Sequence, residues 1–147
     1  MPQLLIVGTG PVARALVAVG EAAGFHVRVA AGPRSPSVGE FVGADEVIVT
    51  PAPQDVEALR PDRDTCVVVC GHDDEFCKPV VKTLSKFKLG YLGVVGSRRH
   101  DNHSLDADPK DPSGVRWPAG VDIGAETPEE IAVSVIADIF KVRKAAG

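Results

Sequence analysis

The chain has 147 residues, which is enough for one domain with its own hydrophobic core. Hydrophobic residues make up 44% of it and charged residues 24%, as in an ordinary globular protein. The net charge of −4 argues against a nucleic-acid partner, and no apolar run approaches the roughly 20 residues that span a membrane. The first residues lack the charged segment and cleavage site of a secretory signal, so we expect a cytoplasmic protein.

The first predicted element is an apolar strand over residues 3–7, followed by a turn with the spacing G-x-G-x-x-A. This spacing is the dinucleotide-binding fingerprint: the first glycine permits a sharp turn, and the second lets a pyrophosphate approach the backbone. The small third residue allows the next helix to pack closely on the strand. The alternative is a tight strand–helix turn without a ligand. We predict a phosphate site formed by Gly8, Thr9, Gly10, Pro11, Val12 and Ala13.

Strands and helices are predicted to alternate along the rest of the chain. A helix over residues 11–23 ends at Gly24. Further strands are expected over 25–30, 46–50, 65–70 and 90–95, with a short helix over 54–59. A longer helix is expected after Asp74, and it includes Val80, Val81, Leu84 and Phe87. Residues 101–118 are polar and rich in proline, which predicts an exposed loop. The last helix follows the capping box of Thr127 and Glu130 and carries an apolar stripe.

This alternation is typical of an α/β protein with a Rossmann-like, doubly wound parallel sheet, here as a single domain over residues 1–147. In such sheets, ligands bind beyond the carboxyl ends of the strands. Several loops that follow strands are therefore candidate binding segments.

The loop after the second strand bears on the choice of nucleotide. An acidic residue usually stands about 20 positions beyond the glycine turn and binds a ribose hydroxyl. The sequence has Ala31 and Gly32 at that strand end, followed by Arg34 and Ser35, which suit a 2′-phosphate. We therefore expect NADP rather than NAD if a dinucleotide binds. The alternative is that Arg34 simply faces solvent.

A second group of candidate binding residues follows the later strands. Arg98 and Arg99 come after a Gly-Ser turn, where two guanidinium groups are able to clamp a phosphate, although surface arginines are common. We predict that Asp122 and Glu126 orient these arginines or close the pocket, with a purely structural role as the alternative. The candidate set from these later segments is His72, Gly96, Ser97, Arg98, Arg99, Asp122 and Glu126.

Cysteines and lysines suggest no further site. Cys66 and Cys70 flank an apolar strand and are interpreted as small buried hydrophobic residues. No cysteine or histidine spacing fits a zinc site, so no metal is expected. Lysines at 78, 82 and 86 repeat every fourth residue opposite an apolar stripe, which indicates a solvated helix face. No pair of residues has the spacing of a catalytic dyad.

Two segments carry a resemblance to a known family. The run G-S-R-R at residues 96–99 and the run G-V-D-I-G-A-E-T-P-E-E-I-A at residues 120–132 resemble the XdhC/CoxI family. The resemblance covers nearly the whole chain but only that family's C-terminal Rossmann domain. The sequence departs from the family in lacking an acid after the second strand and in a shorter segment between His100 and Trp117.

The resemblance implies an accessory role in maturing a molybdenum hydroxylase such as xanthine or CO dehydrogenase. It implies binding of a molybdopterin-type cofactor, a non-catalytic chaperone function, and partnership with the hydroxylase or with a separate XdhC N-terminal-type protein. A homodimer is also expected. From the residues alone, an NADP-dependent oxidoreductase and an NAD(P)-binding regulatory module remain the alternatives.

Overall fold

The computed structural model describes residues 2–31, 43–49, 53–70, 74–95, 115–116 and 118–145. These residues form a six-stranded sheet in the order β3-β2-β1-β4-β5-β6, and every pair of neighbouring strands is parallel. The strands are β1 (Gln3–Val7), β2 (His26–Ala31), β3 (Glu46–Val49), β4 (Thr65–Val69), β5 (Tyr91–Val94) and β6 (Val115–Arg116). The predicted α/β, Rossmann-like parallel sheet is confirmed.

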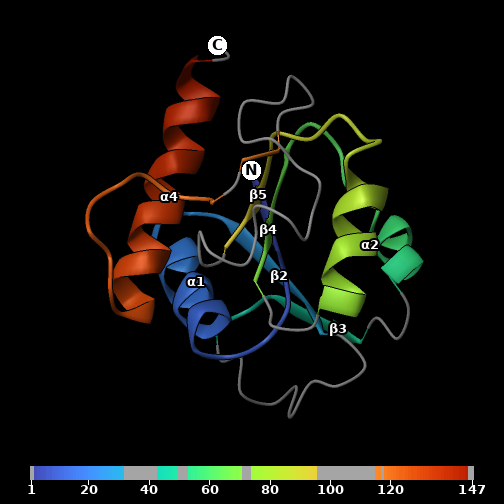
Figure 1. Ribbon diagram of the computed structural model, residues 1–147, viewed down its shortest axis with the longest axis horizontal. Coiled ribbons are helices and arrows are strands. Elements are labelled where there is room, and N and C mark those ends of the chain that lie inside the picture. Colours follow the sequence, from blue (N-terminus) through green and yellow to red (C-terminus); the bar gives the residue numbers. More distant parts are fainter. Residues whose placement is uncertain are drawn as a thin grey trace.

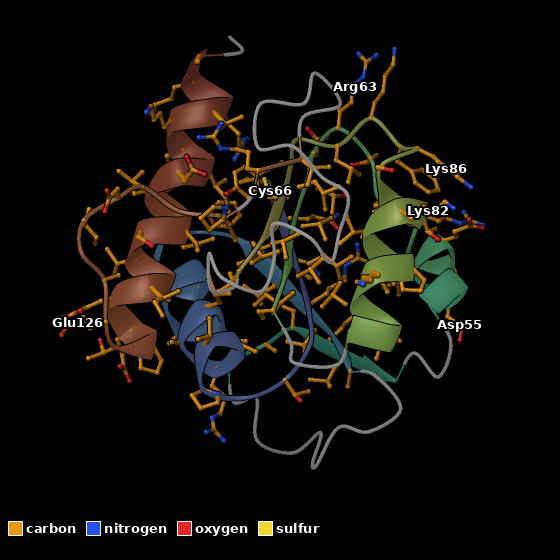
Figure 2. The ribbon with its side chains drawn as sticks, in the orientation of Figure 1. Asp55, Arg63, Cys66, Lys82, Lys86 and Glu126 are labelled. Carbon is orange, nitrogen blue, oxygen red and sulfur yellow. The ribbon has the colours of Figure 1, made fainter. Side chains whose placement is uncertain are left out.

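Helices cover both faces of the sheet (Figure 1). The helices α1 (Pro11–Ala22) and α4 (Pro128–Ala145) lie on one face. On the other face, α2 (Asp74–Leu84) lies beside the 3-10 helix η2 (Pro53–Leu59). Each predicted strand and helix is present to within a few residues at its ends. Lys82 and Lys86 project from α2 and the turn after it, as expected for a solvated face (Figure 2).

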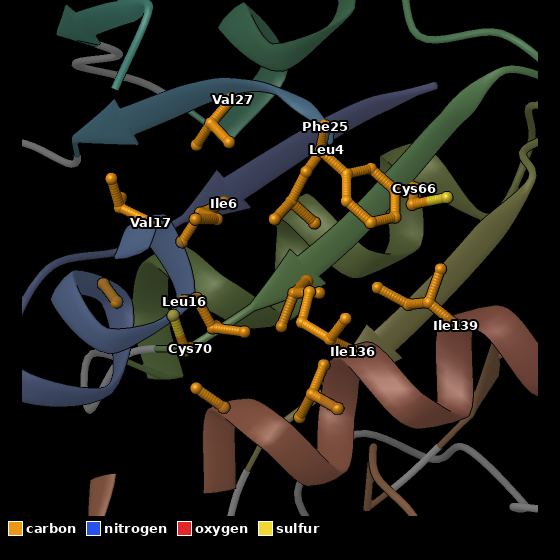
Figure 3. Packing of buried hydrophobic residues seen from close by; sticks show 14 of the residues in the cluster. Leu4, Ile6, Leu16, Val17, Phe25, Val27, Cys66, Cys70, Ile136 and Ile139 are labelled. Atoms are coloured by element: carbon orange, nitrogen blue, oxygen red, sulfur yellow. The ribbon is translucent and has the colours of Figure 1, made fainter. Parts of the chain in front are cut away.

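The sheet is buried on both faces, which explains why its central strands read as unbroken apolar runs. Leu4 and Ile6 of β1 belong to a core cluster with α1 and α4, whereas Leu5 and Val7 belong to a cluster with α2 and η2. Figure 3 shows the first cluster, in which Leu16 and Ile136 meet the strand side chains. Burial of each such aliphatic side chain contributes about 1.5–3 kcal/mol.

Close packing of α1 on the sheet depends on two small residues. Ala13 has no exposed surface. A Cβ atom at Gly20 would lie 2.6 Å from Cδ2 of Leu4, so a larger residue there would push the helix away from β1. Gly24 ends the helix with a φ of 95° and donates its backbone N–H to the carbonyl oxygen of Glu21.

One predicted feature is wrong in part. Residues 101–118 were expected to form an exposed loop, but Val115 and Arg116 form the edge strand β6, paired with Leu92 and Gly93 of β5. Val115 is 4% exposed and packs in the core. A strand of two residues is too short to produce an alternating pattern in the sequence.

Candidate functional site at the β1–α1 turn

The turn between β1 and α1 has the backbone of a phosphate-binding loop. Gly8 and Gly10 have φ angles of 122° and 112°, which side-chain-bearing residues rarely adopt. Gly8 donates its N–H to the carbonyl oxygen of Ala30, which ties the turn to β2. Gly10 is the N-cap of α1, and its carbonyl oxygen accepts the N–H of Arg14. The chain therefore turns directly from a buried strand into the helix.

The amino terminus of α1 is left open for an anion. No side chain caps it, Pro11 occupies its first turn, and that turn contains no acidic residue. The free N–H groups of a helix amino terminus and the helix dipole together favour negative charge. An aspartate or serine at the N-cap would have accepted one of these N–H groups, and Gly10 has no side chain that can do so.

The described residues leave the side of Gly10 open. A Cβ atom built on Gly10 would have no atom within 4 Å among the described residues. The backbone at Gly10, with φ 112° and ψ −173°, lies in a region that essentially only glycine adopts. These residues fit a phosphate group, because they combine an open side at Gly10, an uncapped helix amino terminus and a turn conformation that is free of strain only for glycine.

The sheet topology places this turn where doubly wound folds bind their ligands. The chain leaves β1 toward β2 and β3 on one side, and β4 to β6 lie on the other, so the strand order reverses at β1 and β4. Cys70 follows β4 and donates its N–H to the carbonyl oxygen of Val7, so the ends of these two strands are level. The glycine turn lies at this crevice.

The two cysteines of β4 and its end are buried, as predicted. Cys66 has no exposed surface and Cys70 is 5% exposed, and both belong to the core cluster. Burial raises the pKa of the Cys66 thiol to about 11, which makes it a poor nucleophile at neutral pH. Within the described residues, no cluster of three or more His, Cys, Asp or Glu side chains is arranged to hold a metal ion.

Asp122 and Glu126 lie in the segment that leads into α4. Asp122 accepts the N–H of Gly124 at 3.4 Å, and the backbone N–H of Glu126 donates to Oε1 of Glu130 at 2.8 Å. Both residues are exposed, and among the described residues neither is hydrogen-bonded to the glycine turn. Their predicted role in the pocket stays a prediction.

The structure thus brings together the six residues of the glycine turn, of which Ala13 is buried and the others are at least partly exposed. The remaining predicted contacts fall outside the described residues and stay predictions. They are Arg34, Ser35, His72, Gly96, Ser97, Arg98 and Arg99.

Sequence reasoning missed a buried polar network between α4 and the strands β5 and β6. Asp138 is 1% exposed. Its carboxylate accepts a hydrogen bond from the hydroxyl of Tyr91 at 2.7 Å, and two from Arg116, through Nε at 2.8 Å and Nη2 at 2.9 Å. The N–H of Gly120 lies 3.3 Å from the same carboxylate. The network joins β5, β6, α4 and the segment before α4. Its single sequence signal is an aspartate in an otherwise apolar part of the helix.

The network also shifts the pKa values of its members. Burial alone would raise the pKa of Asp138, but hydrogen bonds from Arg116 and Tyr91 outweigh it and hold the pKa below its ordinary value. Burial and the hydrogen bond to Asp138 raise the pKa of Tyr91, which stays a neutral donor. The hydrogen bond to Asp138 raises the pKa of Arg116. A paired, fully bonded carboxylate of this kind holds distant segments together.

Known proteins of similar sequence point to one family. A protein of Bacillus subtilis (strain 168), described as a probable xanthine dehydrogenase subunit, is 32% identical over 144 residues, which cover 97% of this chain and 43% of the relative. The molybdenum cofactor insertion chaperone PaoD of Escherichia coli (strain K12) is 29% identical over 113 residues, covering 73% of this chain and 35% of PaoD. The chain thus spans less than half the length of either relative.

A solved structure supports the same assignment. A xanthine dehydrogenase from Bacillus halodurans matches with a TM-score of 0.82 and 28% identity, over 99% of this chain and 44% of that chain. None of the helices in the described part of the chain has the length and apolar character needed to cross a membrane. Residues 4–139 match the XdhC Rossmann domain, and the chain therefore belongs to the XdhC family.

Proposed function

We propose that this chain holds a phosphate-bearing, molybdopterin-type cofactor during maturation of a molybdenum hydroxylase such as xanthine or CO dehydrogenase. The observation that carries the proposal is the uncapped amino terminus of α1, with its two positive-φ glycines, in a chain of the XdhC family. The name of PaoD, a molybdenum cofactor insertion chaperone, describes the same kind of role in a relative.

The residues of the turn suit carrying a cofactor better than reacting with it. Backbone N–H groups and the helix dipole bind a phosphate without forming a covalent bond, so the ligand is released intact. Gly10 gives the phosphate access to these donors because no side chain stands between. The cofactor would supply the redox centre of the enzyme that receives it. The role of this chain would be to bind, shield and release that cofactor.

A second candidate function follows from the strand order. The order 3-2-1-4-5-6 with a glycine-rich first turn is that of dinucleotide-binding domains. The chain would then bind NADP or NAD, either as an oxidoreductase or as a regulatory module. Preference for NADP depends on Arg34 and Ser35, which stay candidates from the sequence.

The partners proposed are the hydroxylase itself and a separate XdhC N-terminal-type protein. The chain spans under half the length of these relatives, whose names connect them with xanthine dehydrogenase and with insertion of the molybdenum cofactor. We propose that the protein acts in the cytoplasm and as a homodimer. No nucleic-acid partner is proposed, given the net charge of −4.

Deletion of the gene in its host tests the accessory role. The expected result is a hydroxylase that is made in normal amount but has little activity and little molybdenum. Wild-type protein should restore both, whereas Gly10→Val should not, because its side chain would fill the space beside the turn. A fully active and fully loaded hydroxylase in the deletion strain would refute the role. Sustained NADPH oxidation by the purified protein with a small carbonyl substrate would instead favour the oxidoreductase.

A further inference from the structure

The carboxyl edge of the sheet is continuous from the glycine turn to the segment before α4. Just beyond each of the strands β1, β4, β5 and β6, one residue donates its backbone N–H to a carbonyl oxygen of the neighbouring strand. The donors and acceptors are Gly8 and Ala30, Cys70 and Val7, Val95 and Val69, and Ala119 and Val94. Ala119, three residues after β6, therefore lies level with the ends of β1, β4 and β5.

This register relates Ala119 to the proposed phosphate site. Because neighbouring strands lie about 4.8 Å apart, Ala119 is roughly 14 Å from Gly8 along the edge. A ligand bound across the crevice between β1 and β4 extends from the glycine turn over the ends of β4 and β5. The end of the ligand that lies away from the phosphate then points toward Ala119.

Three successive N–H groups hold residues 119–121, which we call the edge segment. Ala119 is hydrogen-bonded to β5 at 2.8 Å. Gly120 and Val121 are hydrogen-bonded to α4, through the Asp138 carboxylate at 3.3 Å and the carbonyl oxygen of Ser134 at 3.0 Å. A Cβ atom at Gly120 would lie 2.6 Å from Oγ of Ser134, so the backbone packs directly on the helix. From there the chain passes around α4 to the amino terminus of the helix (Figure 1).

The Asp138 carboxylate ties the edge segment to the sheet. It also accepts hydrogen bonds from Tyr91 of β5 and Arg116 of β6. Tyr91 lies back over Gly93, where a Cβ atom would be 2.6 Å from Cε1 of Tyr91 and 2.8 Å from Cβ of Ala119. Because β6 has only two residues, these side-chain hydrogen bonds supply much of the support at this end of the sheet.

A buried carboxylate of this kind fixes geometry more than it adds stability. Removing a carboxylate and a guanidinium from water costs free energy, and apolar residues in the same places are often equally stabilising. The paired hydrogen bonds from Arg116 to Asp138 instead require one relative orientation of β6 and α4. A segment that is already held in place loses little conformational entropy when a ligand binds against it.

We propose that the Asp138 network positions the edge segment as the far wall of the cofactor site, and this proposal rests on the proposed function. The phosphate binds at the glycine turn, and the rest of the cofactor extends over the ends of β4 and β5. The backbone of the edge segment contacts the end of the cofactor that lies away from the phosphate. Asp138, Tyr91 and Arg116 are positioning residues, because they hold this backbone without touching the cofactor.

Amide hydrogen exchange tests where the cofactor lies. Molybdenum cofactor released from a purified hydroxylase and added under anaerobic conditions should slow exchange at the glycine turn and at residues 119–121. Inorganic pyrophosphate, which is too short to reach the edge segment, should slow exchange at the glycine turn alone. Protection by the cofactor that is confined to the glycine turn would overturn the proposal.

Binding affinities for the same two ligands test the network. Asp138→Asn should bind the cofactor at least tenfold more weakly than wild type, with its affinity for pyrophosphate within twofold of wild type. Tyr91→Phe should lose two- to fivefold for the cofactor alone, and it carries the test if Asp138→Asn does not fold. Thr65→Val is the control, because it removes a buried side chain hydrogen-bonded to Asp62 at the other end of β4. It should lower stability without changing either affinity.

The outcomes separate this proposal from the proposed function. Unchanged cofactor affinity in Asp138→Asn and Tyr91→Phe would overturn the positioning role and leave the maturation role intact. An equal loss of affinity for cofactor and pyrophosphate would do the same, because it would show a general loss of structure. Wild-type protein that does not bind the cofactor would count against both proposals.

Discussion

At the scale of single residues, the glycine turn carries the proposed phosphate site. Gly10 adopts a backbone conformation that other residues reach only with strain, and it leaves open space beside the helix amino terminus. A conformation of this kind costs stability when the residue is not glycine, so it is expected where a ligand needs the room. Cys66, in contrast, is fully buried in the core, and its raised pKa makes its thiol poorly reactive at neutral pH.

Gly10→Val should abolish binding of a phosphate-bearing ligand. The matched control is Gly24→Val at the other end of α1, because Gly24 also has positive φ and open space around a Cβ atom. Both variants should lose roughly 1–3 kcal/mol of stability from backbone strain. Only Gly10→Val should lose the rise in melting temperature that a bound ligand gives. Equal ligand responses in the two variants would place the phosphate site elsewhere.

Cys66 should resist alkylation in the native protein. Its thiol is fully buried and its pKa is raised to about 11, so the reactive thiolate is scarce at pH 7. Cys70, at the end of β4 and 5% exposed, should react faster. Peptide mapping after brief treatment with iodoacetamide measures the order, with urea-unfolded protein as the reference in which both react. A faster reaction of Cys66 would contradict the packing described for β4.

At the scale of secondary structure, α4 is the element with the most elaborate supports. Its amino terminus carries the predicted capping box: the Glu130 N–H donates to Oγ1 of Thr127, and the Glu130 carboxylate accepts the N–H groups of Glu126 and Thr127. These hydrogen bonds lower the pKa of Glu130. Farther along, Asp138 ties the helix to β5 and β6. Both supports hold the segment before α4 against the helix.

Thr127→Ala should destabilise the protein by about 0.5–2 kcal/mol, the usual cost of losing a helix N-cap. Thr83→Ala, in α2, makes the same chemical change away from a cap and should have an effect within about 0.5 kcal/mol. Urea denaturation of the three proteins gives the comparison. A loss for Thr127→Ala no larger than the control would mean that the cap is not an important support of α4.

The Asp138 network should make stability depend on acidity. The folded pKa of Asp138 is below its ordinary value, so its contribution is present above the unfolded pKa of about 3.9 and is lost as pH falls through the folded value. Between these two pKa values the unfolded chain binds more protons than the folded protein. The free energy of unfolding therefore decreases as the pH is lowered. Asp138→Asn should be less stable than wild type at pH 7. Its free energy of unfolding should also decline less than that of wild type as the pH is lowered below 5.

Tyr91→Phe keeps the carboxylate and removes one hydrogen bond, so it should cost about 1 kcal/mol and fold normally. It serves as the milder variant where Asp138→Asn is too unstable to measure. Denaturant midpoints across the pH range give both results. Parallel pH profiles for wild type and Asp138→Asn would show that this carboxylate is not the acid-sensitive group.

The sequence predicts regular elements of this fold well and long-range contacts poorly. The apolar strands β1 and β4 are visible because buried parallel strands are continuously hydrophobic. The cap at Thr127 is visible because its partners lie three or four residues apart. Tyr91 and Asp138, however, are 47 residues apart, and no local pattern signals their contact. The edge strand β6 is missed for the same reason, since pairing with β5 defines it.

At the scale of the whole molecule, the fold places the glycine turn and the amino terminus of α4 at one edge of the sheet. The sheet reverses its strand order at β1 and β4, which places the glycine turn in the crevice. The amino terminus of α4 lies at the same edge. Under the proposed function, a cofactor bound at the glycine turn would be presented at this edge. Both features lie within residues 4–139, which match the XdhC Rossmann domain.

Native mass spectrometry of protein purified from its own host tests the central claim most directly. The expected result is a bound, phosphorylated pterin that co-purifies with wild-type protein and is absent from Gly10→Val, while Gly24→Val retains it. A dinucleotide in the wild-type protein would support the second candidate function instead. Wild-type protein that carries no ligand, and that gains none when incubated with molybdenum cofactor released from a purified hydroxylase, would contradict the proposal that this chain holds the cofactor.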